Sequence, residues 1–110
     1  MKPLKDMPRV AVTGASGFIG RHVINELERN GAWVIAMARE KKKDLPVLTN
    51  GRWIFFDHSQ SVSTDIEDLG QPDALIHLAW QGLPNYQSLH HFENELPNQY
   101  HFLKRMLQLH

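Results

Sequence analysis

Two side chains near the C-terminus have the types and the spacing that proton transfer requires. Tyr100 and Lys104 stand four residues apart in the segment YHFLK, and side chains at that spacing lie on the same face of a helix. A phenol can pass a proton, and a neighbouring ammonium group can stabilise the phenolate that remains. The pair therefore allows two interpretations, an acid–base site or a surface helix that matches the pattern, and the surrounding elements must decide between them.

A second chemical signal lies near the N-terminus, in the segment TGASGFIG. Its glycines stand at positions 14, 17 and 20, between an apolar run typical of a strand and an amphipathic segment typical of a helix. Gly14 allows the tight turn off the strand, Gly17 leaves room for a pyrophosphate, and Gly20 lets the helix pack closely on the sheet. Free N–H groups and the positive end of the helix dipole would hold the phosphates. The alternative is a glycine-rich turn without a ligand, but the full strand–loop–helix context favours a phosphate-binding loop.

The elements that must position these residues alternate along the chain. Four short apolar runs predict buried strands at 9–14, 33–38, 52–57 and 73–80. Helical spacing predicts one helix from Phe18 to the Asn30-Gly31 turn and another from about Pro97 onward. The strands do not alternate between apolar and polar residues, as expected when both faces are covered. We therefore predict an α/β fold, a partial Rossmann fold whose parallel sheet has about four strands in the order 3-2-1-4, with helices on both faces.

Three segments together resemble one protein family. The glycine spacing of TGASGFIG, the run DALIHLAW and the segment LAWQGLPNYQSLHHFENELPNQYHFLK are similar to the extended short-chain dehydrogenase/reductase family, in its NAD-dependent epimerase/dehydratase group. The resemblance covers the chain from Arg9 to its end. It implies a single NAD(P)-binding domain over residues 1–110, of an oxidoreductase type, and a nucleotide-linked deoxysugar as the substrate of the full-length family.

The resemblance also implies which residues bind the cofactor, through the glycine loop and the ends of the second, third and fourth strands. These positions are Gly14, Ser16, Gly17, Phe18, Ile19, Gly20, Arg39, Asp57, His58, Leu78, Ala79 and Trp80. Ala38 stands where members that use NAD carry an acid, and Arg39 follows it. Because a guanidinium can bind a 2′-phosphate, this pattern favours NADP over NAD. Against it, Glu40 could replace the missing acid, and the charged segment REKKKD could be only a solvated loop.

The position of YHFLK in the chain bears on whether Tyr100 and Lys104 form an acid–base site. In the resembling family the Tyr-x-x-x-Lys pair lies on the helix after the fifth strand, whereas Tyr100 and Lys104 follow the fourth. The resemblance thus implies a chance match and no catalytic residues in this chain, which we expect to be the N-terminal half of a longer enzyme, inactive alone. Two alternatives stay open: a regulatory or interaction module that senses the dinucleotide, and a minimal reductase that uses Tyr100 and Lys104.

Composition limits the partners and the location. Among 110 residues, 12 basic and 12 acidic residues balance, which gives no charge-based case for nucleic acid or membrane binding. Cysteine is absent and the seven histidines form no ligand pattern, so we expect no metal site. We interpret His77 as a hydrogen-bonded core histidine.

No apolar run could span a membrane or act as a signal peptide, which predicts a cytoplasmic protein. The strand 73–80 would be an edge without proline or lysine, so we expect self-association through it or marginal stability.

Overall fold

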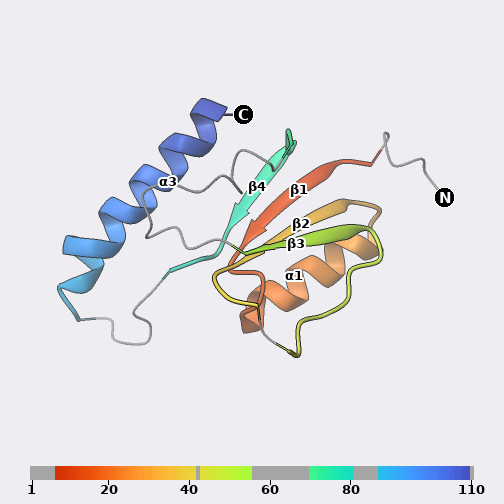
Figure 1. The fold of residues 1–110 in the computed structure, drawn as a ribbon, viewed down its shortest axis with the longest axis horizontal. Coiled ribbons are helices and arrows are strands. Elements are labelled where there is room, and N and C mark those ends of the chain that lie inside the picture. Colours follow the sequence, from red (N-terminus) through yellow and green to blue (C-terminus); the bar gives the residue numbers. More distant parts are fainter. Residues whose placement is uncertain (1–6, 42, 56–69, 81–86, 110) are drawn as a thin grey trace.

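The computed structural model describes residues 7–41, 43–55, 70–80 and 87–109. In these ranges the elements are β1 (Arg9–Thr13), α1 (Phe18–Arg29), β2 (Trp33–Ala38), β3 (Gly51–Phe55), β4 (Ala74–His77), the π-helical turn η2 (His91–Glu95) and α3 (Leu96–Leu109). All strand pairs are parallel, and the strand order is β3-β2-β1-β4 (Figure 1). The predicted α/β class and the order 3-2-1-4 are confirmed.

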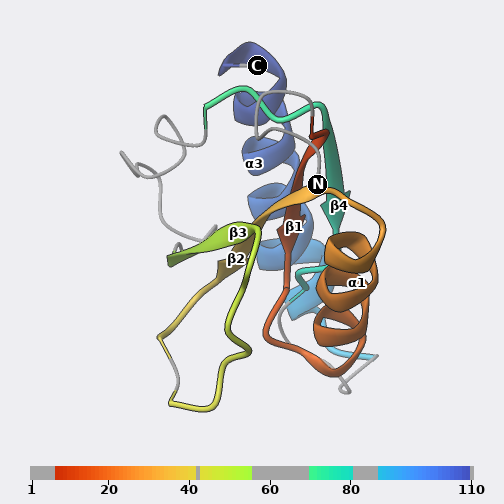
Figure 2. The same ribbon diagram turned by 90° about the vertical axis from the view of Figure 1, so that its right-hand side faces the viewer.

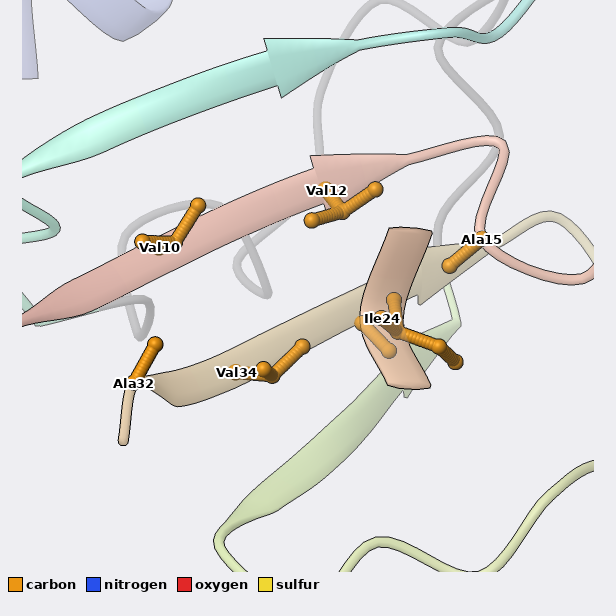
Figure 3. Packing of buried hydrophobic residues seen from close by; sticks show 7 residues of the cluster. Val10, Val12, Ala15, Ile24, Ala32 and Val34 are labelled. Atoms are coloured by element: carbon orange, nitrogen blue, oxygen red, sulfur yellow. The ribbon is translucent and has the colours of Figure 1, made fainter. Parts of the chain in front are cut away.

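Among the described residues, α1 packs on one face of the sheet and α3 on the other (Figure 2). The buried residues between α1 and its face are Val10, Val12, Ala15, Ile24, Ala32, Val34 and Ala36 (Figure 3). The buried residues between α3 and the opposite face are Ala11, Ile35, Met37, Ile54, Phe102 and Met106. Because successive strand residues point to opposite faces, β1 and β2 must be apolar at consecutive positions, and this explains the missing alternation.

Helix α1 agrees with its prediction at both ends. It begins at Phe18 and ends at Arg29, and the backbone N–H of Asn30 still bonds to the last turn. Gly31 follows with φ +85°, a conformation that glycine adopts without a steric penalty. The chain then enters β2, whose bounds are those predicted.

The fourth strand is shorter than predicted, and the register explains why. Thr13 pairs with His77 at the end of the β1–β4 ladder, and Gly14, with φ +66°, then turns the chain out of the sheet. Leu78 and the residues after it therefore have no β1 residue opposite them. Segment 78–80 leaves the sheet and becomes available to the site described below.

The C-terminal helix begins earlier than predicted. The helical backbone starts at His91 with the η2 turn and continues without a break into α3 at Leu96. Pro97 thus lies inside this continuous helical segment, directly after the η2 turn, and not at its start. Proline has no N–H to donate to the preceding turn, and the π-helical turn ahead of it departs from the regular α-helical hydrogen-bond pattern at that point.

Candidate functional site

A pocket of about 240 Å³ lies at the carboxyl edge of the sheet. The parallel strands all end at this edge (Figure 1), so the segments that follow β1, β2 and β4 converge there. The lining residues are Thr13, Gly14, Ser16, Gly17, Met37, Ala38, Arg39, His77, Leu78, Ala79, Trp80 and Phe102. This is the position at which open α/β sheets bind their ligands.

The pocket brings together seven of the twelve predicted cofactor residues: Gly14, Ser16, Gly17, Arg39, Leu78, Ala79 and Trp80. Three others belong to the first turn of α1 and do not line it. The side chains of Phe18 and Ile19 are largely exposed, and Gly20 is buried beneath the loop. Asp57 and His58 lie outside the described residues.

The three loop glycines differ in what the fold demands of them. At Gly14, φ is +66°, a conformation that strains residues with a side chain, and an added Cβ would lie 2.9 Å from the backbone N of Ala79. Both the backbone conformation and the lack of space therefore exclude a side chain. At Gly20, an added Cβ would collide with the Gly14 carbonyl oxygen and lie 2.7 Å from Ala15 Cα.

Gly17 is different. Its φ is −76°, and among the described atoms an added Cβ would meet the Gly14 carbonyl oxygen at 3.4 Å, an ordinary contact. The fold therefore requires glycine at 14 and 20, but not at 17, although Gly17 lines the pocket.

Helix α1 begins at the pocket wall. Gly17 is its N-cap residue; no side chain of the described residues caps it, and its first turn contains no acidic residue. The first N–H groups of a helix have no acceptor within the helix and carry its partial positive charge. This end of α1 can therefore bind an anion beside Gly17.

An arginine that the sequence analysis did not single out holds the loop in shape. The Nε–H of Arg21 donates to the Ser16 carbonyl at 2.9 Å, and its Nη2 lies 3.3 Å from Oδ2 of Asp44. Asp44 is mostly exposed, so the ion pair adds little stability. Its structural effect is to connect the glycine loop to the segment that follows β2.

A polar network forms the opposite wall of the pocket, where Thr13 and His77 line it, and continues behind that wall. Thr13 Oγ1 is 2.6 Å from His77 Nδ1, and His77 Nε2 is hydrogen-bonded to Gln99 Oε1. The Gln99 amide nitrogen donates to the Ala79 carbonyl at 2.7 Å and to Oε2 of the fully buried Glu95 at 2.6 Å. His77 is hydrogen-bonded as predicted, but it is half-buried and lines the pocket instead of lying in the core. No pattern in the sequence indicates Thr13, Gln99 and Glu95 as members of this network.

Arg39 and Trp80 line the pocket at the ends of β2 and β4. Arg39 is exposed directly after the buried Ala38, and the exposed Glu40 does not line the pocket. The indole N–H of Trp80 donates to His91 Nδ1 at 2.7 Å, and the two rings stack with centroids 6.0 Å apart. The far end of the pocket is thus aromatic, and its end beside β2 is cationic.

Tyr100 and Lys104 do not line the pocket. The Tyr100 side chain is 58% exposed, and the Lys104 Nζ lies 6.0 Å from the centroid of its ring. The pair shares one face of α3, as its spacing predicts, but that face points away from the pocket wall formed by Phe102.

Within the described part of the chain, no three side chains of His, Cys, Asp or Glu gather closely enough to hold a metal ion. No helix there is both long and apolar enough to cross a membrane.

Comparison with known proteins gives one family and several relatives. The model of the NAD dependent epimerase/dehydratase family matches residues 10–93. The chain is 31% identical over 101 residues to a dTDP-6-deoxy-L-talose 4-dehydrogenase (NAD(+)) of Aggregatibacter actinomycetemcomitans, which covers 91% of this chain and 37% of that protein. It is 39% identical over 74 residues to a CDP-abequose synthase of Salmonella typhimurium, covering 64% of this chain and 24% of that one. The chain therefore spans well under half the length of either relative.

A solved structure supports the same relationship. MoeE5 in complex with UDP-glucuronic acid and NAD superposes on this chain with a TM-score of 0.67 and 29% identity. The match covers 92% of this chain and 33% of that one.

Proposed function

Because this chain belongs to the NAD dependent epimerase/dehydratase family, we propose that its pocket binds a nicotinamide dinucleotide through the glycine loop. The observation that carries this proposal is the space at Gly17. The described atoms leave room for a Cβ at that position, so the fold alone does not account for glycine there, and a ligand that approaches the backbone would. A pyrophosphate at the N-terminus of α1 is such a ligand, since it needs both close approach and free N–H donors.

The pocket suits the central part of a dinucleotide. Its volume of about 240 Å³ is below the roughly 300–1,000 Å³ of sites that enclose a whole small molecule. The pyrophosphate would lie against Gly14, Ser16 and Gly17, and the nicotinamide ribose against Leu78–Trp80. From the family resemblance we propose that Asp57 and His58, which lie outside the described residues, contact the adenine.

The form of the cofactor depends on two opposing observations. Arg39 lines the pocket at the end of β2, and position 38, where an acid would bind the ribose of NAD, holds alanine. Both features favour the 2′-phosphate of NADP. The names of the talose dehydrogenase and of the MoeE5 complex instead contain NAD. We propose a preference for NADP that Arg39 confers.

We propose that the substrate class of the full-length relatives is nucleotide-linked sugars. The talose dehydrogenase and the abequose synthase are named for dTDP- and CDP-linked sugars, and MoeE5 was solved with UDP-glucuronic acid. For this chain we propose dinucleotide binding without turnover, since Tyr100 and Lys104 lie outside the pocket. A dinucleotide-sensing module would use the same pocket in the same way.

Isothermal titration of the full chain with NAD and NADP tests the proposal. We expect one molecule to bind per chain. ADP-ribose, which keeps the pyrophosphate and both riboses, should compete, whereas nicotinamide riboside, which has no phosphate, should not. A folded chain that binds neither dinucleotide would refute the proposed function.

A further inference from the structure

We infer that Gln99 is a positioning residue for the pocket: from α3 it fixes His77 in one neutral tautomer and holds the segment after β4 in place. This role of Gln99 concerns the shape of the pocket wall after β4 and is separate from contact with the cofactor. Only its consequence for affinity rests on the proposed function. The hydrogen-bond donors and acceptors of four side chains carry it.

The Thr13 hydroxyl determines one nitrogen of His77. Its oxygen accepts hydrogen bonds from the backbone N–H of Leu78 at 3.0 Å and of Ala79 at 3.2 Å. A hydroxyl has two acceptor lone pairs and one proton, so both lone pairs are in use. The proton must therefore point to His77 Nδ1, which is 2.6 Å away. This nitrogen is an acceptor and carries no proton.

Gln99 determines the other nitrogen independently. A backbone carbonyl can only accept, so the Gln99 atom 2.7 Å from the Ala79 oxygen must be the amide nitrogen. The second hydrogen of that nitrogen goes to Glu95 Oε2. The Gln99 carbonyl oxygen then faces His77 Nε2, which must carry the proton. The contacts of Thr13 and of Gln99 thus agree on one state of His77, a neutral imidazole protonated at Nε2.

The same contacts hold the pocket wall from two sides. The N–H of Ala79 is bound to Thr13 at the end of β1, and its carbonyl is bound to Gln99 on α3. Gly14 is in close backbone contact with this segment, since an added Cβ there would lie 2.9 Å from the Ala79 nitrogen. Ala79 therefore connects the segment after β4 with the end of β1, with the glycine loop and with α3.

Burial makes the network costly to break. Thr13 and Gln99 are each 4% exposed and Glu95 is fully buried, so a lost partner would leave a polar group without water to replace it. Both ring nitrogens of His77 form hydrogen bonds within the protein. Its ring stacks on that of Phe102 with the ring centroids 5.2 Å apart. His77 therefore acts as a rigid wall of the pocket, not as a proton donor to a ligand.

NMR of the unliganded full chain tests the inference first. Long-range ¹H–¹⁵N correlation of the histidine rings should give His77 a pyrrole-type Nε2 and a pyridine-type Nδ1, in a single form. A proton on Nδ1, or a mixture of both tautomers, would overturn the assignment. This measurement needs no variant and no cofactor.

Substitution then tests the positioning role. Gln99→Met keeps the length of the side chain but removes its hydrogen bonds, and Gln108→Met, at an exposed glutamine of the same helix, is the matched control. We expect Gln99→Met alone to shift the amide resonances of residues 78–80 and to weaken dinucleotide binding about tenfold. If both variants leave these resonances and the affinity as in the wild type, Gln99 does not position the wall. If the wild type shows the expected tautomer and Gln99→Met shifts the resonances, but no dinucleotide binds, the positioning role stands and the proposed function falls.

Discussion

The substitution of Gly17 separates binding from folding more sharply than any other change in the pocket. In Gly17→Ala and Gly17→Val the new Cβ meets the Gly14 carbonyl oxygen at 3.4 Å, and φ stays at −76°. Replacing glycine makes the unfolded chain less flexible, which stabilises the folded state, but alanine and valine are poorer N-cap residues than glycine, which destabilises it. These two effects on stability oppose each other. We therefore expect the free energy of unfolding of Gly17→Ala to change by less than about 1 kcal/mol.

The effect on binding should be much larger. A side chain at Gly17 would occupy space that a pyrophosphate needs, and forcing extra groups into a filled site costs about 1–3 kcal/mol. That cost corresponds to a dinucleotide affinity about 5- to 150-fold weaker, with valine at the upper end. Titration calorimetry measures the affinity, and urea denaturation of the same preparations measures the stability.

Gly20→Ala is the matched control for this experiment. Its Cβ would lie 2.7 Å from Ala15 Cα in the interior of the loop, so it should lower the stability itself. If Gly17→Val is folded and binds a dinucleotide as tightly as the wild type, the reasoning from the space at Gly17 is refuted.

Three further predictions concern other parts of the chain. Arg39→Ala should weaken NADP binding and leave NAD binding nearly unchanged, because only NADP carries the 2′-phosphate; equal weakening of both would show that Arg39 is not the selector. Tyr100→Phe should leave dinucleotide affinity unchanged, since this side chain lies outside the pocket, and a clear loss in titration would contradict the placement. In the described sheet β4 is an edge strand, and we propose that the chain self-associates through it. Light scattering should then show oligomers that Ala74→Lys dissociates and the surface control Gln108→Lys does not, and a monomeric wild type would disprove this.

The sequence predicts the sheet and the glycine loop well because their signals are local. The apolar runs are continuous wherever both faces of a strand are buried, and the end of α1 is marked by the Asn30-Gly31 pair. The end of β4 is not marked in this way. The run DALIHLAW stays apolar to Trp80, but the strand stops at His77 because β1 turns away at Gly14, more than sixty residues earlier in the chain.

In helix α3, the apolar residues alone do not identify the buried face. Phe102 and Met106 are buried as the apolar spacing suggests, but Leu103 is 36% exposed and Leu107 is 83% exposed. The buried stripe that contains Phe102 and Met106 continues toward the N-terminus of the helix through Gln99 and Glu95. Gln99 is buried where it bonds to His77 and Ala79 of the pocket wall, and Glu95 is buried beside Gln99, to which it is hydrogen-bonded. A periodicity argument that counts only apolar residues cannot find such a stripe.

The glycine loop shows how requirements of the fold and of a ligand can be separated within one motif. Gly14 and Gly20 are explained without any ligand, because close backbone contacts exclude a side chain at both. A turn that binds nothing would need the same two glycines, so they cannot distinguish a phosphate-binding loop from a structural one. Gly17 has neither positive φ nor a close neighbour that forbids a Cβ. Among the three, it is therefore the residue whose type reports on binding, and its substitution tests function where changes at the other two would test only the fold.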